Sequence, residues 1–450
     1  MAEIKKILIA NRGEIVQRAI RTIREMGKKS VAVYSAGDKN ASYLKHADEA
    51  VCIGGAKSKD SYLNIPAIIT AAEMTGCDAI FPGYGFLSEN QDFVEICRLH
   101  NIKFIGPSVE VMEKMADKSK AKEEMIRAGV PVVPGSKGAV HSVTEGRKVA
   151  LEIGYPIMAK AAAGGGGRGM RLIKEESEFD QLFMAASSEA LAAFGDGTMY
   201  LERFINNPRH IEVQVVGDSH GNAIHIGERD CSLQRRHQKV IEESPAILLN
   251  DETRAKLHEV AVKATKYLKY EGAGTFEFLA DDKQNIYFME MNTRLQVEHP
   301  VSEMVSGIDI VELMIKVAEG EKVPPQESIK FRGHAIECRI TAEDPNSFLP
   351  CPGKVTQWMV PGGRNVRVDS HVYTNYIVPP HYDSMIGKLI VWGRDRNKAI
   401  NIMKRALAEF EVEGIKTTIP FHQKMMENED FISNNYDTKY LENYKNLDEL

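Results

Sequence analysis

Polar and apolar side chains alternate along residues 290–298, EMNTRLQVE. Alternate side chains of an extended chain share a face, so we expect one face to carry Glu290, Asn292, Arg294, Gln296 and Glu298. A guanidinium and an amide set beside two acids suit an anion and a cation held in one site. The alternative is a solvated strand, and a turn before Glu298 would break the pattern.

Just upstream, GTFEFLADDKQNIYFME predicts two strands joined by a polar turn. Glu277 and Glu290 lie near the open end of this hairpin, where both carboxylates could reach one divalent ion. Magnesium prefers a few carboxylates, retained water and substrate phosphates over a cage made only of protein ligands. Two surface acids on a hairpin are the alternative interpretation.

A glycine-rich segment, GGGGRG at residues 164–169, lies between the strand-like runs PIMAKA and MRLIK. It satisfies G-x-G-x-x-G, but a strand follows it where a dinucleotide site would have a helix, and it lacks the Gly-Lys-Ser/Thr of a P-loop. We interpret it as a hairpin lid whose backbone N–H groups close over phosphates, with Lys160 adding a positive charge. A flexible surface loop is the alternative.

Charge is concentrated in GERDCSLQRRHQK at residues 227–239, which holds six formal charges in thirteen residues, four of them basic. A solvated loop is the default interpretation of such a run. In an acidic chain it could instead form the local basic pocket that an anionic substrate needs. Upstream, HIEVQVV predicts an ordinary half-buried strand with His210, Glu212 and Gln214 on one face.

The elements that must position these residues begin with a regular alternation of strands and helices. KKILIA is followed by a helical pattern that stops at Gly27, and the rhythm continues for about a hundred residues, which predicts βαβ units and a parallel sheet. Asn-Arg-Gly-Glu follows the first strand in place of G-x-G-x-x-G, so this domain should be Rossmann-like without binding a dinucleotide. Strands dominate after about residue 204, and VPPQES near 323–328 resembles a linker.

The length, composition and charge of the chain exclude several classes of protein. A chain of 450 residues with 43% hydrophobic and 27% charged residues should fold as a soluble protein of two to four domains. The formal net charge of −6 argues against a duplex nucleic-acid binder. The six cysteines lack metal-ligand spacing and suit a reducing compartment, and no apolar run reaches the length of a membrane span. We therefore expect a cytoplasmic protein that binds neither nucleic acid nor membrane.

Several motifs together resemble one known family. IANRGEI, PGYGFLSEN, GGGGRGM, GERDCSLQRRHQK, EMNTRLQVEHP, ECRITAEDP and PPHYDSMIGKL occur in the order found in biotin carboxylases of the ATP-grasp superfamily. The resemblance implies a multidomain α/β and α+β fold with three parts: a Rossmann-like N-terminal domain at 1–115, an ATP-grasp domain at 116–330 with a mobile lid at about 134–203, and a C-terminal domain at 331–450.

The resemblance also implies residues that bind ATP and Mg²⁺ or Mn²⁺. Lys118 and Lys160 should contact the ATP phosphates beneath the lid formed by Gly164, Gly165, Gly166, Gly167 and Gly169. Glu202 should bind the adenine side of ATP, with His210 and His237 nearby. The metal ligands should be Glu277, Glu290 and Asn292.

For the second substrate and the chemistry, the resemblance implies another group. Bicarbonate should be held by Lys239, Arg294, Gln296 and the backbone of Val297. Glu298 should be the general base that deprotonates bicarbonate, and Arg339 should stabilise the biotin enolate. Tyr84 and Gly85 should lie beside the path of biotin. Two departures are visible, since Phe81 stands where many relatives have His and Ala162-Ala163 replace residues that are often Ser or Gly.

The implied activity is the ATP- and bicarbonate-dependent carboxylation of biotin on a separate biotin carboxyl carrier protein, with a carboxyltransferase subunit as a further partner and a homodimer as the expected assembly. The final acceptor stays open between acetyl-CoA, as in fatty acid biosynthesis, another acyl-CoA, pyruvate and a 2-oxo acid. Two alternatives belong to other classes: an ATP-grasp ligase whose acyl phosphate is captured by an amine, and a non-catalytic nucleotide-binding relative.

Overall fold

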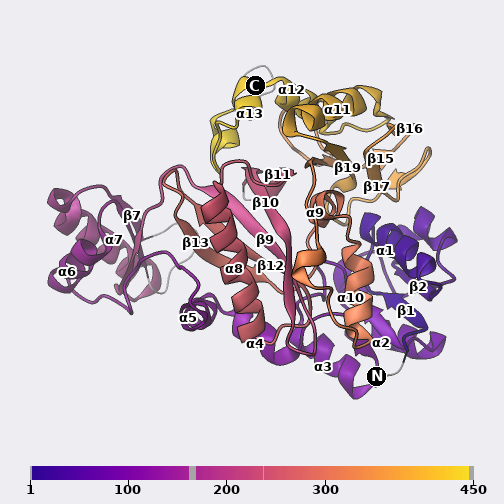
Figure 1. Ribbon diagram of the computed structural model, residues 1–450, viewed down its shortest axis with the longest axis horizontal. Coiled ribbons are helices and arrows are strands. Elements are labelled where there is room, and N and C mark those ends of the chain that lie inside the picture. The colour runs from indigo at the N-terminus through magenta and orange to yellow at the C-terminus, as the bar shows by residue number, and fades with distance from the viewer. Residues whose placement is uncertain (1–2, 162–168, 237, 445–450) are drawn as a thin grey trace. The chain divides into compact units, whose positions relative to one another are not determined.

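The computed structural model describes residues 3–161, 169–236 and 238–444, and Figure 1 shows the order of their elements. The chain divides into two units. The first combines Met1–Val130, Arg209–Phe278 and Glu290–Leu450, and the second combines Pro131–Pro208 and Leu279–Met289. The expected division at residues 115 and 330, with a lid at 134–203, stays a prediction.

The first unit begins with the predicted parallel sheet, which is thereby confirmed. In sheet order its strands are β3 (Glu49–Cys52), β2 (Lys29–Tyr34), β1 (Lys6–Ile9), β4 (Ala79–Phe81) and β5 (Lys103–Phe104). Its helices are α1 (Glu14–Glu25), α2 (Ile65–Thr75), α3 (Gln91–Leu99) and α4 (Val109–Ala116). The sequence pattern missed β3 because its four residues are mostly exposed and carry no apolar run.

A close contact between two loops at the carboxyl end of this sheet positions later functional groups. The Nδ2 atom of Asn11 donates to the backbone carbonyls of Pro82 and Tyr84, at 2.7 and 2.8 Å. Gly83 has a φ of +63°, and a Cβ there would lie 3.0 Å from Nδ2 of Asn11, so a side chain at this position would push the loops apart. The loop after β4 is therefore fixed against the turn that begins α1.

An eight-stranded sheet forms the rest of the first unit's framework, and its pairs from β9 to β17 are antiparallel. In sheet order the strands are β13 (Ile286–Asn292), β12 (Gly272–Ala280), β9 (Arg209–Gly217), β10 (Ala223–Arg235), β11 (Gln238–Ser244), β14 (His334–Thr341), β19 (Met385–Gly393) and β17 (Val366–Ser370). Because β11 pairs with β14, the sheet continues across residue 330.

Helices pack on this sheet: α8 (Asp251–Tyr267) on β9 and β10, α9 (His299–Ser306) on β10 and β14, and α11 (Arg396–Glu409) on β14 and β19. The other helices of this part of the chain are α5 (Lys118–Ala128), which contacts α8, α10 (Ile310–Ala318), which contacts α1, α12 (Ile419–Glu427), which contacts α11, and α13 (Glu429–Ser433), which contacts α12. Figure 1 shows α8 lying along β9 and β10. Every residue of β9 is buried, so the expectation of a half-buried strand is wrong, and the polar side chains of this strand must find partners inside the protein.

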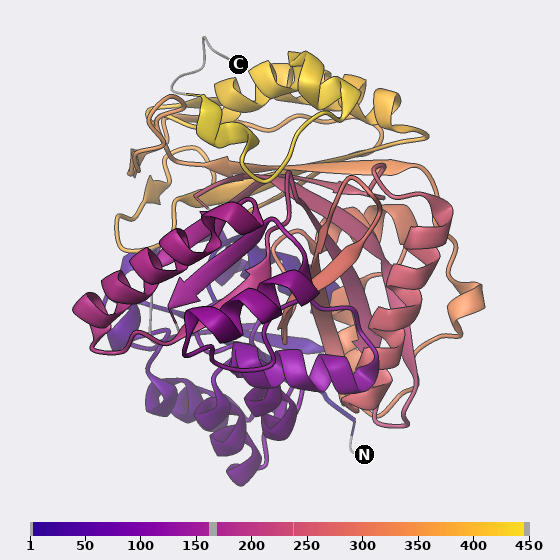
Figure 2. The ribbon, with the colours of Figure 1, turned by 90° about the vertical axis from the view of Figure 1, so that its left-hand side faces the viewer.

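The second unit contains the strands that flank the glycine-rich segment. β6 (Ile157–Ala161) lies between β7 (Met170–Ile173) and β8 (Met199–Arg203) in an antiparallel sheet. The helices α6 (Val143–Ile153) and α7 (Phe179–Phe194) pack against these strands around a small core that includes Phe183 (Figure 2). The predicted strand on each side of the glycines is confirmed, and residues 162–168 lie outside the described part of the chain.

All six cysteines are free thiols. Within the described ranges, no helix combines the length and the apolar composition needed to cross a membrane.

Candidate functional site

A fully buried arginine organises the centre of the eight-stranded sheet. Arg229 of β10 has 0% exposure and donates to Glu212 and Gln214 of β9 at 2.5 and 2.8 Å. It also donates to Gln296 at 3.0 Å, and its remaining donors bond Ser302 and Thr275. A buried guanidinium is tolerated when its donors are satisfied in this way. Arg229 therefore fixes β9, β12 and the segment from Gln296 to Ser302 relative to β10.

A buried ammonium lies beside this arginine and binds three carboxylates. Nζ of Lys239, near the start of β11, lies 2.5 Å from Glu212, 2.9 Å from Glu277 and 2.7 Å from Glu298. Burial acts to lower the pKa of Lys239, but the three carboxylates outweigh it and raise that pKa well above the ordinary value. Lys239 is therefore charged at neutral pH, and it gathers acids from β9, β12 and the start of α9.

Glu298 is held between two cations. One carboxylate oxygen accepts from Lys239, and the other accepts from Arg339 of β14 at 3.0 Å. Burial favours the protonated form of Glu298, but the charges of Lys239 and Arg339 prevail and place its pKa below the ordinary value. Glu298 also immediately precedes α9, where the helix dipole favours a negative charge. The side chain is ionised at neutral pH, as a general base must be.

Arg339 is itself oriented by a second acid and by its own backbone. Its Nε donates to Glu242 of β11 at 2.6 Å. Its carbonyl accepts from Thr418 at 3.2 Å and from Nε2 of His422 on α12 at 2.7 Å. Both the side chain and the backbone of Arg339 are therefore held in place where the guanidinium contacts Glu298.

The expected extended run from Glu290 to Glu298 is wrong beyond Asn292, where β13 ends and the chain turns into α9. Tertiary contacts cause the turn: Glu89 accepts from the backbone N–H and the hydroxyl of Thr293, at 3.0 and 3.1 Å. Glu89 also accepts from Arg294 at 3.0 Å. The alternation of the sequence therefore does not explain why these polar groups converge.

Several of the predicted groups converge nevertheless, around Glu277. One oxygen of Glu277 accepts from Asn292 and from Gln296, both at 2.8 Å. The other lies 3.2 Å from Nε2 of His210. Arg294 donates to Oδ1 of Asn292 at 2.9 Å.

These residues fit a magnesium ion by the chemistry of their donors. Glu277, Glu290 and Asn292 offer oxygen atoms, which are the ligands that Mg²⁺ and Mn²⁺ prefer. Glu290 is half-buried and lies two residues before Asn292 on β13, so the two share a face. The nearby trio of His210, Glu212 and Glu277 also brings possible ligand atoms within 4.8 Å of one another, but its imidazole nitrogen suits Mg²⁺ less well.

The charged run at residues 227–239 is not the solvated loop that its composition suggests. Residues 227–233 are buried within β10, and β10 and β11 form a hairpin that ends near Arg235 and Gln238. The second interpretation, a local basic pocket, fits the structure, because Arg235, Arg236 and Lys239 line a cavity.

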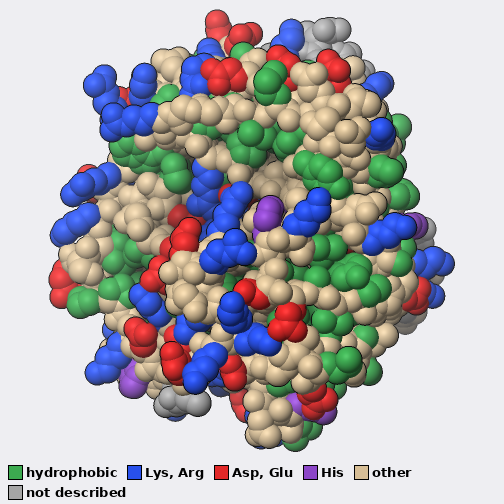
Figure 3. Space-filling view, turned by 90° about the vertical axis from the view of Figure 1, so that its right-hand side faces the viewer, with side chains coloured by type: hydrophobic (Ala, Val, Ile, Leu, Met, Phe, Trp, Pro, Cys, Tyr) green, Lys and Arg blue, Asp and Glu red, His purple; other side chains and the backbone are tan. Residues whose placement is uncertain are grey.

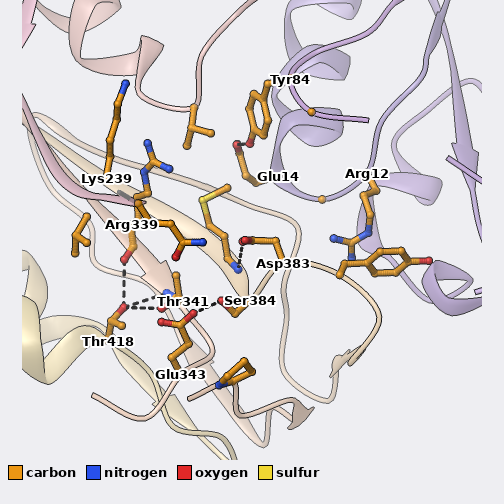
Figure 4. Close-up of a pocket in the computed structure, with 18 of the residues that line it drawn as sticks. Arg12, Glu14, Tyr84, Lys239, Arg339, Thr341, Glu343, Asp383, Ser384 and Thr418 are labelled. Atoms are coloured by element: carbon orange, nitrogen blue, oxygen red, sulfur yellow. Dashed lines mark hydrogen bonds between the residues drawn. The ribbon is translucent and has the colours of Figure 1, made fainter. Parts of the chain in front are cut away.

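This cavity has a volume of about 840 Å³ and lies within the first unit. Five of the residues expected to meet bicarbonate or biotin line it: Tyr84, Gly85, Lys239, Val297 and Arg339. Figure 4 shows Lys239 and Arg339 on one side and Tyr84 with Glu14 on the other. The space-filling view shows Lys and Arg side chains gathered near the middle of one face of the molecule (Figure 3). The pocket is large enough for a small bicyclic ligand and is positively charged on one wall.

Three described residues that were expected to bind ATP lie in the second unit: Lys160, Gly169 and Glu202. Lys160 of β6 and Glu202 of β8 form an ion pair of 2.6 Å on adjacent strands. Gly169 has a φ of +67°, and a Cβ there would lie 2.9 Å from the Cβ of Ala161, so this position requires glycine. The side chain of Lys118, the residues Gly164, Gly165, Gly166 and Gly167, and His237 lie outside the described part of the chain.

Of the two departures from the family pattern, the structure describes only the one at Phe81. Phe81 is fully buried in β4, within the core of the first unit. Ala162 and Ala163 lie outside the described residues.

The sequence patterns assign no role to Arg229, Glu242, His422 or Glu89, and they indicate only an ordinary strand at Glu212. Each of them forms a direct hydrogen bond with a predicted site residue that lies far away in the sequence. The sequence around them gives no local signal of burial, since Arg229 lies between Glu228 and Asp230 in a charged run and Glu242 is followed by Glu243.

Three family models match successive parts of the chain. Residues 3–112 match the "Biotin carboxylase, N-terminal domain", residues 117–326 the "Carbamoyl-phosphate synthase L chain, ATP binding domain", and residues 337–443 the "Biotin carboxylase C-terminal domain". Among characterised proteins, the chain is 56% identical over 439 residues to a biotin carboxylase from Nostoc sp., covering 97% of this chain and 98% of that protein.

Solved structures agree over nearly the full length. A complex of Campylobacter jejuni biotin carboxylase with β,γ-ATP is 68% identical, with a TM-score of 0.88, and the match covers 98% of this chain and 99% of that one. The dimeric biotin carboxylase domain of Hydrogenobacter thermophilus 2-oxoglutarate carboxylase, solved with MgADP, ADP and bicarbonate, is 49% identical, with a TM-score of 0.85 and 98% of each chain covered.

The buried imidazole of His422 predicts a pH effect on stability. Its Nε2 donates to the Arg339 carbonyl, its Nδ1 has no hydrogen-bond partner among the described atoms, and burial lowers its pKa to about 4. Unfolding restores an ordinary pKa of about 6.5, so the unfolded chain takes up the proton first. The stability that neutral His422 provides is therefore complete above about pH 6.5 and is lost as the pH falls toward 4, by about 2 kcal/mol between pH 7 and pH 5.

Urea unfolding at pH 7 and pH 5 tests this. His422→Gln should lose about 2 kcal/mol less stability than the unmodified protein over this interval. His100→Gln, at an exposed histidine, controls for the change of residue type. Equal losses in the unmodified protein and in His422→Gln would contradict the assignment.

Proposed function

This chain belongs to the biotin carboxylase family, and we propose that its buried charge network and the adjoining pocket carboxylate biotin carried on a separate protein, using ATP and bicarbonate. The enzyme is an ATP-dependent ligase that catalyses the first half-reaction of a biotin-dependent carboxylase. The observation that carries the residue assignments is the position of Glu298, an ionised acid between Lys239 and Arg339, which both line the pocket.

Glu298 is the proposed base for bicarbonate. Its oxygens are 2.7 Å from Lys239 and 3.0 Å from Arg339, so a bicarbonate that approaches this acid meets two cations that offset its charge. Removal of the bicarbonate proton gives an oxygen nucleophile that attacks the γ-phosphorus of ATP and displaces ADP. Gln296, Arg294 and the Val297 backbone are the further proposed contacts of bicarbonate.

Phosphoryl transfer requires that charge on the transferring group be neutralised. When bound, magnesium would supply that charge, and Glu277, Glu290 and Asn292 are its proposed ligands. Lys160, Glu202 and Lys118 are the proposed ATP contacts, with the lid glycines closing over the phosphates. The ion pair between Lys160 and Glu202 supports this assignment, since it brings the two side chains together on adjacent strands.

Arg339 is the proposed partner of the second chemical step. Carboxyphosphate, the product of the first step, releases CO₂ and phosphate, and phosphate takes the proton from the ureido nitrogen of biotin. The guanidinium stabilises the negative oxygen that results, in the manner of an oxyanion hole, and the deprotonated nitrogen then attacks CO₂ to form the N–C bond of carboxybiotin. Tyr84 and Gly85 form the opposite side of the pocket, and exclusion of water by lid closure protects carboxyphosphate from hydrolysis.

A carrier and a transferase are the proposed partners of this chain. The described pocket offers room for a biotinyl group that enters from outside. A homodimer is the proposed assembly, supported by the dimeric relative described above. Six free thiols suit the cytoplasm as the proposed location. The final acceptor of the carboxyl group stays open.

Replacement of the base gives the first functional prediction. Glu298→Gln keeps the size of the side chain but removes its charge, so turnover should fall by about two to four orders of magnitude while the KM for ATP stays near normal. Bicarbonate-dependent ADP release measures both quantities. Glu319→Gln makes the same chemical change at an ion pair with Lys28 on another part of the unit, and it should keep normal turnover. Unchanged turnover in Glu298→Gln would remove this residue from the role of base.

Removal of the guanidinium separates the two steps. Arg339→Ala should reduce carboxylation of free biotin more than it reduces ATP cleavage in the absence of biotin, because the enolate forms only in the second step. The ratio of the two rates, measured in one preparation, corrects for any loss of folded protein. Equal losses of both activities would contradict the assignment of Arg339 to the biotin step.

A further inference from the structure

A second buried cation lies beside Arg339 and has no part in the mechanism above. Lys388 of β19 has 0% exposure and pairs in register with Arg339 of β14 and with Asp369 of β17. Two like charges directly opposite on one face of a sheet repel each other, and a buried ammonium loses its hydration. Strong partners must therefore keep Lys388 in place.

The first partner is a backbone carbonyl next to the proposed base. Nζ of Lys388 donates to the carbonyl oxygen of Val297 at 2.8 Å. Val297 lines the pocket and immediately precedes Glu298. One bond from Lys388 therefore fixes the peptide that leads into Glu298 and forms part of the proposed bicarbonate contact.

The second partner reaches the opposite wall of the pocket. Nζ of Lys388 lies 3.0 Å from Oε1 of Glu14, at the start of α1. The same oxygen accepts the hydroxyl hydrogen of Tyr84, and Figure 4 shows Tyr84 and Glu14 pointing toward each other. Tyr84 and Glu14 line the pocket, whereas Lys388 is not among its lining residues. Lys388 thus joins two walls of the pocket without touching what the pocket holds.

The charge of Lys388 is maintained by its surroundings. Burial acts to lower its pKa, but the charges of nearby acids, first of all Glu14 and also Asp369, outweigh burial and raise that pKa. Glu337 contributes no hydrogen bond, since neither of its oxygens has a partner among the described atoms and its pKa lies well above the ordinary value. The directional bonds of Lys388 are therefore those to Val297 and Glu14.

Building on the function proposed above, we propose that Lys388 is a positioning residue that holds the Val297–Glu298 peptide and, through Glu14, the Tyr84 wall in one arrangement, so that bicarbonate and biotin are bound together. Lys388 acts through these residues and contacts neither substrate. Its loss should therefore weaken the use of bicarbonate and biotin while leaving the use of ATP unchanged.

A control can separate a purely structural role of Lys388 from the proposed positioning role, because another lysine of the chain forms the same kinds of bonds. Lys28 also donates to a backbone carbonyl and to a glutamate, Ile4 at 2.7 Å and Glu319 at 2.6 Å. Its side chain is also largely buried, and it does not line the pocket. Lys28→Met therefore removes the same kind of bonds without affecting the pocket walls.

The experiment measures melting temperature and the KM values for ATP, bicarbonate and free biotin in the full chain. Lys388→Met should raise the KM for bicarbonate and for biotin by about tenfold, as expected for loss of bonds from a charged donor, with the KM for ATP within about twofold of normal. Lys28→Met should lower the melting temperature and leave all three KM values unchanged.

A double variant keeps the test decisive if Lys388→Met folds poorly. Lys388→Met with Glu14→Gln removes both buried charges and keeps an acceptor for Tyr84, so it should recover the melting temperature but keep the raised KM for bicarbonate. Normal KM values in the double variant, or equal rises for ATP, bicarbonate and biotin, would overturn the role of Lys388. Absence of bicarbonate- and biotin-dependent ADP release in the unmodified protein would instead overturn the proposed function.

Discussion

The ammonium of Lys239, surrounded by Glu212, Glu277 and Glu298 inside the eight-stranded sheet, is the interaction on which the rest of the site depends. Each of these acids is buried, and a buried carboxylate without a partner would take up a proton. The shared cation keeps Glu298 ionised and joins β9, β12 and the start of α9. Loss of that charge would therefore disturb the proposed base and a proposed metal ligand together.

The fold makes such a network possible because it buries polar strand faces on both sides. Water cannot satisfy the polar groups of β9 and β10, so Arg229 and Lys239 must do so. The same constraint fixes geometry, because a buried charge held by several bonds has few alternative positions. Only the ends of this network open to the pocket, where Lys239 and Arg339 meet the cavity. The proposed reaction therefore takes place where the buried charge network meets the pocket.

The sequence predicts the elements of this protein well and their tertiary contacts poorly. Short apolar runs separated by turn residues predicted the parallel sheet, the strands on either side of the glycines and the β12–β13 hairpin, since such patterns depend only on residues that are close in the sequence. The turn after Asn292 has no local signal, because Glu89 produces it from a distant loop. The burial of Arg229 was missed for the same reason, since its partners lie on β9, β12 and the segment after β13. Resemblance to a family, and not periodicity, indicated which groups converge.

In the mechanism proposed above, one buried network, held by Lys239, activates bicarbonate for transfer to biotin. The most direct test is the incorporation of isotopically labelled bicarbonate into free biotin by the unmodified protein with Mg-ATP, followed together with ADP release. Labelled carboxybiotin should form only when ATP is present, and ADP release should require bicarbonate. ADP release that ignores bicarbonate, with no label in biotin, would contradict this mechanism.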